Sequence, residues 1–405
     1  MGRSVGVVGV GTMGAGIAQL ALEAGHGVVI HDIDAAAIER GRTRIRFGLE
    51  RRAARLDLDA AAAEAWIEDR LGRLTAARAL DDLAAANPEL VIEAALEDLE
   101  AKRAIFRLLD ELTPATTILA TNTSALSVGA IAGAATRPAR VLGLHFFNPA
   151  PVMPLVEVVI APGTDPLVAA HATDLMTAWG KVPVHCTDTP GFIVNRVNRP
   201  FTLEALAILA EGAATIESID AAMRAAGFPM GPFELMDLVG LDINLAAARG
   251  VFGGSTAAGD PAAERFRPSP IQERLVAEGR LGRKTEEGFY TYDGTGRPIG
   301  PAPDFAAPAA ESAAADGDPR GRLADARIAR RITLAIVNEA YRALGEGIAT
   351  AVDIELAMRL GAGHAVGPFE RAERLGGPAA VRDALIGFAD EGPRFEPAPA
   401  LLEPG

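Results

Sequence analysis

The first half of the chain alternates short apolar runs with longer stretches of helical periodicity. Residues 3–8 form an apolar run bounded by glycine, typical of a buried parallel strand, and Met13 to Ala24 follows with helical spacing. Val28–His31 is the next predicted strand, and Asp34 stands where the N-cap of a helix to about Arg55 belongs. Further strands are predicted at 89–93, 117–121, 141–146, 154–159 and 181–186, with a helix at 166–179. The alternation predicts an α/β domain with a doubly wound parallel sheet over residues 1–188.

The pattern changes after Asp188, where helical spacing replaces the alternation. We expect an all-α domain over 189–292, followed by a linker over 293–322 that is rich in Ala, Pro, Gly and Asp. A second helical segment is predicted over 323–392, and the Pro- and Glu-rich residues 393–405 are expected to form a loose tail.

The second helical segment repeats the first. Glu211-Gly212 and Gly231-Pro232-Phe233-Glu234 recur as Glu346-Gly347 and Gly367-Pro368-Phe369-Glu370, at an offset of 135 that becomes 136 after one insertion. Two copies are too few for a solenoid, so the sequence predicts a duplicated all-α C-terminal domain.

Composition and charge narrow the class of protein. The 405 residues are 49% hydrophobic and 23% charged, as in a globular protein with sizeable cores, and no run is apolar and long enough to span a membrane. The net charge of −14 argues against a nucleic-acid partner. A single cysteine, Cys186, excludes an intrachain disulfide framework and favours a reducing compartment. With no room for a leader before residue 3, we expect a cytoplasmic protein, and we predict no metal site.

A glycine-rich turn follows the first predicted strand. Gly9, Gly11 and Gly14 form a G-x-G-x-x-G with Thr12 and Met13, at the start of the first predicted helix. In a Rossmann-type sheet such a turn lets the backbone approach a pyrophosphate at the helix N-terminus. Asp32 ends the second strand, where a carboxylate accepts hydrogen bonds from ribose hydroxyls and repels a 2′-phosphate. This context predicts NAD as cofactor, against the alternative of a glycine turn beside a solvated aspartate.

Arginines gather on the predicted helix after Asp34. The cluster consists of Arg40, Arg42, Arg44, Arg46, Arg51, Arg52 and Arg55. Arg44, Arg51 and Arg55 share one helical face, which in an acidic chain indicates an anionic ligand. A solvated basic face is an equal alternative.

His145 ends the strand predicted at 141–146, at the edge where open α/β sheets bind ligands. Glu157 interrupts an otherwise apolar strand, and a buried carboxylate there needs a partner. A His–Glu pair suits acid–base catalysis, because the carboxylate fixes the tautomer and stabilises the imidazolium. The alternative is a hydrogen-bonded core histidine.

Several motifs occur together along this chain, in a definite order and spacing. They are Gly9–Gly14, Asn122-Thr123-Ser124, Gly143–Pro149, Pro151–Glu157, Asp188–Arg196 and Gly231–Glu234. Over about residues 3–292 the chain resembles the NAD-dependent L-3-hydroxyacyl-CoA dehydrogenases, including the 3-hydroxybutyryl-CoA dehydrogenases, and the duplicated unit resembles the second copy of longer members. The resemblance implies oxidation of an L-3-hydroxyacyl-CoA to a 3-oxoacyl-CoA in fatty acid β-oxidation or a related degradation.

The resemblance also implies roles for individual residues. His145 corresponds to the catalytic base and Glu157 to its orienting carboxylate, while Ser124 and Asn195 correspond to residues that hold the reacting oxygen and the thioester region. Asn148 is expected beside the nicotinamide. The implied cofactor contacts are Glu97, Lys102 and Lys284. The arginine helix (Arg44, Arg51, Arg55), with Ser124, is expected to bind coenzyme A, although Arg55 replaces a usual lysine and Gly48 a serine.

Other interpretations remain at this stage. The chain could be an NAD-linked dehydrogenase of another hydroxy acid, or a catalytically silent NAD-binding or structural relative. Ser124 could cap a helix starting near Ala125, and Asn195 and Arg196 could be ordinary surface residues. The second copy has Arg330 where the first has Asn195, so we expect it to be catalytically degenerate. The presence of this second copy leaves two oligomeric states open, a homodimer or a pseudo-dimeric monomer.

Overall fold

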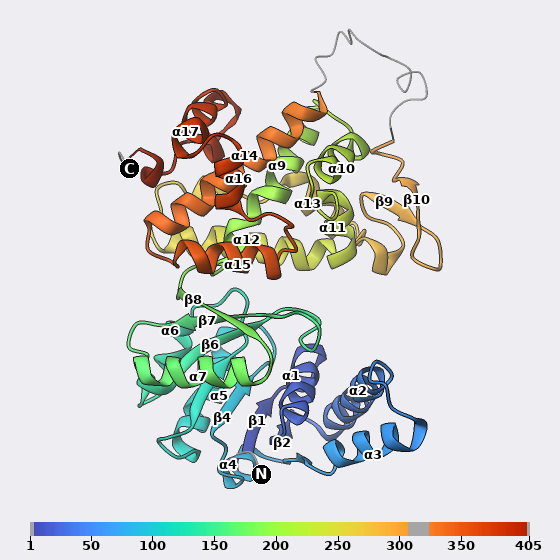
Figure 1. Ribbon diagram of the computed structural model, residues 1–405, viewed down its shortest axis with the longest axis vertical. Coiled ribbons are helices and arrows are strands. Elements are labelled where there is room, and N and C mark those ends of the chain that lie inside the picture. The colour runs from blue at the N-terminus through green and yellow to red at the C-terminus, as the bar shows by residue number, and fades with distance from the viewer. Residues whose placement is uncertain (1–3, 307–323, 403–405) are drawn as a thin grey trace. The chain divides into compact units, whose positions relative to one another are not determined.

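The computed structural model describes residues 4–306 and 324–402 (Figure 1). The contacts divide the chain into two compact units, Met1–Asp188 and Thr189–Gly405. Most of the predicted linker (307–322) and the end of the predicted tail (403–405) lie outside the described residues.

The first unit is built on an eight-stranded sheet of order β3-β2-β1-β4-β5-β6-β7-β8. Its strands are β1 Ser4–Val8, β2 Gly27–His31, β3 Leu74–Ala76, β4 Leu90–Glu93, β5 Ile118–Thr121, β6 Val141–Phe146, β7 Leu155–Ile160 and β8 Val182–Thr187. The first six run parallel in the 3-2-1-4-5-6 order of Rossmann folds, which confirms the predicted fold class. Strand β3 is too short to give a pattern and was not predicted.

The sheet departs from the predicted all-parallel arrangement at one edge. Strand β7 runs antiparallel to β6, and β8 runs parallel to β7. The eight residues 147–154 between β6 and β7 contain no helix, and a parallel pair needs a crossover of a dozen residues or more. Helix α7 (Pro166–Ala178) supplies such a crossover between β7 and β8.

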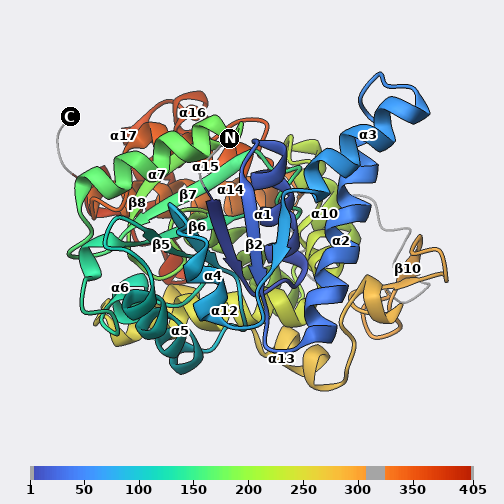
Figure 2. The same ribbon diagram turned by 90° about the horizontal axis from the view of Figure 1, so that it is seen from below.

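Helices cover both faces of this sheet, as seen from below in Figure 2. One face shares an apolar core with α1 (Thr12–Glu23), α2 (Ala35–Ala53), α3 (Ala60–Leu71) and α7. The other packs against α4 (Leu80–Ala85), α5 (Leu99–Leu112) and α6 (Val128–Ala132). The predicted cap of α2 is confirmed, because the Asp34 carboxylate accepts a hydrogen bond of 2.6 Å from the amide of Ala37.

The second unit is largely helical, as the sequence predicts. Its first copy and the helices that follow are α8 Val194–Val197, α9 Arg199–Ala210, α10 Ile216–Ala225, α11 Pro232–Val239, α12 Leu241–Ala257 and α13 Pro270–Ala277. The second copy and its last helix are α14 Asp325–Gly345, α15 Ala351–Leu360, α16 Pro368–Arg374 and α17 Pro378–Ile386. Helix α14 packs against α9 and α10, so the two copies form one compact body.

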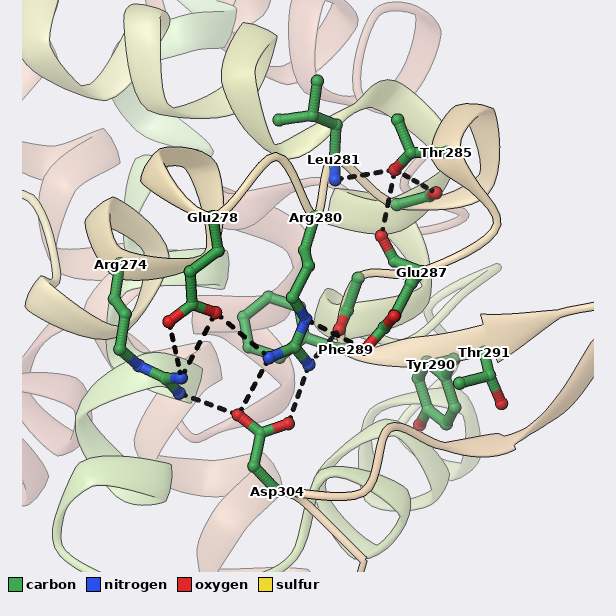
Figure 3. Close-up of polar contacts among 12 residues, drawn as sticks. Arg274, Glu278, Arg280, Leu281, Thr285, Glu287, Phe289, Tyr290, Thr291 and Asp304 are labelled. Carbon is green, nitrogen blue, oxygen red and sulfur yellow. Dashed lines mark hydrogen bonds and ion pairs between the residues drawn. The ribbon is translucent and has the colours of Figure 1, made fainter.

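The start of the predicted linker is folded rather than extended. Strands β9 (Tyr290–Tyr292) and β10 (Pro298–Pro301) form an antiparallel hairpin. The Asp304 carboxylate then accepts hydrogen bonds from Arg280 (2.7 Å) and Arg274 (2.9 Å), at the end of α13 (Figure 3). These ion pairs fix the chain after the hairpin against the helical body.

Residues 393–402, expected to form a loose tail, also pack onto the helices. Phe395, Ala398 and Leu401 are buried in an apolar core with residues of α14, α16 and α17. Asn338 on α14 accepts a hydrogen bond of 2.8 Å from the amide of Ala398. The proline-rich composition hid the apolar residues that anchor this segment.

Reciprocal ion pairs join the two copies. Arg196 in the first copy pairs with Glu339 (2.7 Å) and Glu346 (2.8 Å) in the second. At the repeat-related positions, Arg331 pairs with Glu204 and, at 2.7 Å, with Glu211. Each arginine therefore reaches the glutamates of the other copy, as across a two-fold dimer interface. Arg196 is buried, so the alternative interpretation of it as an ordinary surface residue is wrong.

None of the described helices is long and apolar enough to cross a membrane. Within the same residues, no group of histidine, cysteine and acidic side chains could hold a metal ion.

Candidate active site

The glycine turn has the geometry that a bound dinucleotide requires. Gly9 has φ +87°, and a Cβ there would lie 2.7 Å from the backbone of Ala94. A Cβ on Gly14 would lie 1.8 Å from the carbonyl oxygen of Gly9, so β1 and α1 can approach only because this residue is glycine. Gly11 faces open space at the N-terminus of α1, where a phosphate can approach the backbone.

Asp32 lies beside this turn, at the carboxyl end of β2. Its carboxylate accepts hydrogen bonds from the amides of Val10 (2.7 Å) and Ile33 (2.8 Å). It lines a hollow with Gly11, Asp34, Ala37, Arg40 and other residues of the turn and of α2. The carboxylate is thus held facing the space next to the glycine turn, which fits a ribose diol.

His145 and Glu157 lie directly opposite each other in the antiparallel pair β6–β7. The Nδ1–H of His145 donates a hydrogen bond of 2.6 Å to Oε2 of Glu157, and both side chains are buried. Because an ionised carboxylate only accepts, Nδ1 carries the proton and Nε2 is the nitrogen that can take one up. The reversed direction of β7, which the sequence pattern did not reveal, is what brings the two residues into register.

The Ser124 loop is held by the carboxylate of Glu97. Oε1 of Glu97 accepts hydrogen bonds from the Thr123 hydroxyl (2.6 Å) and the Ser124 amide (3.1 Å). Burial would raise the pKa of Glu97, but the Thr123 hydrogen bond and the Lys102 ammonium outweigh it and lower this pKa. Helix α6 starts at Val128 and is capped by Ser127, so the alternative of Ser124 as a helix cap is wrong.

Lys102 lies behind this loop rather than on the surface. Its ammonium, 1% exposed, lies 2.8 Å from Glu93 and 3.3 Å from Glu97. Glu93 is fully buried and also accepts a hydrogen bond of 2.7 Å from the Thr121 hydroxyl. Sequence reasoning missed Glu93, although a glutamate ending an apolar strand is the same signal that singled out Glu157.

A cavity of about 310 Å³ opens between α1, α2 and the loop after β6. Its lining includes Thr12, Gly16, Gln19, Arg44, Phe47, Gly48, Arg51, Arg52, Arg55, Pro149, Pro151 and Val152. The three arginines that the helical periodicity placed on one face therefore meet in one cavity. A Cβ on Gly48 would lie 2.0 Å from the Gln19 side chain, so Gln19 occupies the space that the family's usual serine needs.

Lys181, before β8, supports the wall of this cavity and was not predicted. Its buried ammonium donates hydrogen bonds to the carbonyls of Ala150 (2.6 Å) and Met153 (2.8 Å). Burial lowers the pKa of Lys181 to about 8. The lysine thus ties down the loop that starts with Asn148, whose own side chain is exposed.

The remaining predicted residues lie in the second unit. Asn195 is half-buried on α8. The Lys284 ammonium lies 2.6 Å from the Asp242 carboxylate. A hydrogen bond spans the loop that carries Lys284: the hydroxyl of Thr285 accepts it, at 2.8 Å, from the amide of Leu281 (Figure 3).

Two other sequence interpretations concern β8. Cys186 is buried, as expected of a small apolar residue. His185, for which the sequence showed no partner, lies with Nε2 2.9 Å from the Thr173 hydroxyl on α7. Neither observation adds a residue to the site.

Comparison with known families matches nearly the whole described chain. Residues 4–189 match the model of "3-hydroxyacyl-CoA dehydrogenase, NAD binding domain". Residues 191–292 and 328–401 both match "3-hydroxyacyl-CoA dehydrogenase, C-terminal domain". The duplicated helical domain predicted from the repeat thus corresponds to two matches to one domain.

The names of individual relatives agree with these family models. The "3-hydroxyadipyl-CoA dehydrogenase" of Escherichia coli K12 is 48% identical over 291 residues, which are 72% of this chain and 59% of that protein. The mitochondrial "Hydroxyacyl-coenzyme A dehydrogenase" of Rattus norvegicus is 42% identical over 294 residues, 72% of this chain and 91% of that protein. Thus the chain spans less than two thirds of the first relative's length but nearly all of the second's.

Among solved structures, a 3-hydroxybutyryl-CoA dehydrogenase from Escherichia coli K12 is similar along the whole chain. It has a TM-score of 0.84 and 36% identity, and the match covers 99% of this chain and 97% of that one. Since both the family models and these relatives cover most of the sequence, the chain belongs to the 3-hydroxyacyl-CoA dehydrogenase family, whose cofactor is NAD.

Proposed function

We propose that this protein oxidises L-3-hydroxyacyl-CoA to 3-oxoacyl-CoA, with His145 as the base. NAD supplies the acceptor for the hydride that leaves C3 of the substrate. Nε2 of His145 takes the proton of the 3-hydroxyl group, and the Glu157 carboxylate stabilises the imidazolium that forms. The observation that carries the proposal is the buried 2.6 Å hydrogen bond between Nδ1 of His145 and Glu157.

The other site residues are assigned to binding. The glycine turn and Asp32 hold the pyrophosphate and the adenosine ribose, with Thr12 and Met13 beginning the helix behind them. We assign Asn148 to a contact with the nicotinamide. Glu97, Lys102 and Lys284 are assigned to further contacts with the cofactor. Ser124 and Asn195 hold the substrate oxygen and the thioester region.

A substrate comparison tests this function. With NAD, we expect the protein to form NADH from 3-hydroxybutyryl-CoA. The rate of NADH formation from free 3-hydroxybutyrate should be much lower. Comparable turnover of the free acid would favour the dehydrogenase of another hydroxy acid. No turnover of any acyl-CoA would favour a silent NAD-binding relative.

We assign the arginine-lined cavity to coenzyme A. We expect Arg51→Ala and Arg55→Ala each to raise KM for the acyl-CoA about tenfold, because each loses a charge-assisted hydrogen bond to phosphate. Steady-state kinetics should show little change in kcat or in KM for NAD.

The matched control is Arg42→Ala, since Arg42 is exposed on the same helix but does not line the cavity. A rise in KM for the acyl-CoA of the same size in Arg42→Ala would contradict the assignment and indicate a general effect of surface charge.

We further propose that the chain is a pseudo-dimeric monomer. The reciprocal pairing of Arg196 and Arg331 with glutamates of the other copy resembles an isologous interface contained in one chain. Light scattering should therefore give a solution mass near the 42.0 kDa of one chain. A mass of about twice that value would contradict the proposal and support a homodimer.

The single cysteine supports our proposal of a reducing compartment, the cytoplasm, as the setting of the reaction. From the class of reaction, we propose that the protein acts in fatty acid β-oxidation or a related acyl-CoA degradation.

A further inference from the structure

The loop that joins β6 to β7 has few hydrogen-bond donors of its own. Three of its eight residues, 147–154, are prolines, which have no backbone N–H. Within the loop, the amide of Met153 donates a hydrogen bond of 3.0 Å to the carbonyl of Pro149. The carbonyls of Ala150 and Met153 accept instead from Lys181, outside the loop, at 2.6 and 2.8 Å. One side chain therefore holds the loop at two points.

The same loop forms one wall of the arginine-lined cavity. The cavity lining includes three of its residues, Pro149, Pro151 and Val152. The loop also packs closely on α1, since a Cβ on Gly16 would lie 3.0 Å from Cδ of Pro151. A shift of the loop would change the shape of the cavity that we assign to coenzyme A. His145 and Glu157, in contrast, are held by the register of β6 and β7.

Lys181 is one of only three lysines among the 39 basic residues of the chain. The other two, Lys102 and Lys284, form ion pairs with carboxylates. In residues 4–306 and 324–402, no carboxylate lies within ion-pair distance of the Lys181 ammonium, which donates to the two loop carbonyls. A compact ammonium can bond both carbonyls at once, and its charge strengthens both hydrogen bonds. The hold on the loop therefore depends on the charge of this lysine.

Burial lowers the pKa of Lys181 to about 8, so this lysine loses its charge at a pH where an exposed lysine keeps it. Glu23 on α1 is the charged group of the described chain that opposes this shift. The loop 147–154 has no titratable side chain. The other titratable groups on α7, β7 and β8 are His171, Asp174, Glu157, His185 and Cys186. None of these groups shifts the pKa of Lys181.

We propose that Lys181 is a positioning residue for the acyl-CoA: its charged ammonium holds the loop 147–154 as a wall of the cavity, and loss of its proton releases the loop and weakens acyl-CoA binding. Linkage makes this effect reciprocal, so acyl-CoA binding should favour the protonated lysine and take up a proton near pH 8. The inference rests on the proposed function, through the assignment of this cavity to coenzyme A.

Binding of butyryl-CoA, which has no 3-hydroxyl group to oxidise, tests the proposal without turnover. In calorimetry on the wild-type protein we expect the affinity to fall about tenfold from pH 7 to about pH 9.5, because charge-assisted hydrogen bonds are weakened. Buffers of different ionisation enthalpy should reveal proton uptake on binding at about pH 8. The coenzyme A phosphates contribute little to this change, because the second pKa of a phosphate monoester is about 6.

Two variants of Lys181 and a remote control identify the lysine as the source of the pH dependence. Lys181→Met removes the donors, so it should weaken butyryl-CoA binding about tenfold at pH 7 and make the affinity independent of pH. Lys181→Arg should also remove the pH dependence, because a guanidinium keeps its charge, and should recover part of the affinity. Arg107→Met, at an exposed position on α5, should keep the wild-type affinity and its pH dependence.

Steady-state kinetics should separate binding from chemistry. With 3-hydroxybutyryl-CoA at pH 7, Lys181→Met should raise KM about tenfold and leave kcat within about threefold, because the β6–β7 register still holds His145 and Glu157. Wild-type affinity for butyryl-CoA in Lys181→Met, or a constant wild-type affinity from pH 7 to about pH 9.5, would overturn the proposal. A lower unfolding temperature in Lys181→Met with the wild-type pH profile of binding would also overturn it, since Lys181 would then only stabilise the fold.

The binding experiment separates this inference from the proposed function. A pH-dependent affinity for butyryl-CoA that becomes constant in Lys181→Met supports the role of Lys181 even if the protein oxidises no 3-hydroxyacyl-CoA. Fast oxidation together with a pH-independent affinity in the wild-type protein would overturn the role of Lys181 and leave the proposed function standing.

Discussion

His145→Gln is expected to lower kcat by about 10²- to 10⁴-fold, or roughly 3–5 kcal/mol of barrier. A glutamine amide can still donate a hydrogen bond to Glu157, so the strand pair β6–β7 keeps its buried polar contact. What it lacks is the basic nitrogen that takes the substrate proton. Stopped-flow measurement of NADH formation with saturating acyl-CoA isolates the chemical step from product release.

Two further variants show whether the loss expected in His145→Gln is a loss of catalysis or of structure. Glu157→Gln should cost less than His145→Gln, because the imidazole remains but loses the charge that orients and stabilises it. His185→Gln should leave kcat within about twofold, since His185 on β8 contacts Thr173 and has no assigned role in the reaction. Equilibrium binding of NAD should be unchanged in all three, and wild-type kcat in His145→Gln would exclude the mechanism.

The sequence predicts the first unit well where the signal is local. The glycine turn, Asp32 and the cap Asp34 each depend on a few neighbouring residues, and each lies where local reasoning placed it. Helix α2 is another such case, because its arginine face follows from helical periodicity and lines a cavity.

What the sequence could not show depends on pairing between distant segments. The reversal of β7 follows from the lack of a crossover helix, yet only the register with β6 puts Glu157 opposite His145. The clamp of Lys181 on Ala150 and Met153 joins residues about 30 positions apart with no motif to mark it.

The second large effect is expected in stability rather than in catalysis. Glu339 is 2% exposed and accepts hydrogen bonds of 2.7 Å from both Arg196 and Arg265. Glu339→Gln keeps the shape but leaves two buried guanidinium groups without this charge, so we expect the second unit to lose about 3–5 kcal/mol of unfolding free energy. Urea denaturation followed by circular dichroism measures the loss.

Burial, and not the number of ion pairs, should determine the size of this loss. Glu346 pairs with the same Arg196 at 2.8 Å, but its side chain is 45% exposed, so Glu346→Gln should cost less than about 1 kcal/mol. The repeat-related Glu204, fully buried between Arg331 and Arg394, should behave like Glu339. Each of these two glutamates binds an arginine from the other copy. Equal losses of unfolding free energy in Glu339→Gln and Glu204→Gln would therefore show that the two copies stabilise each other reciprocally. A loss confined to one variant, or as large in Glu346→Gln, would show instead that the second copy is an independent appendage.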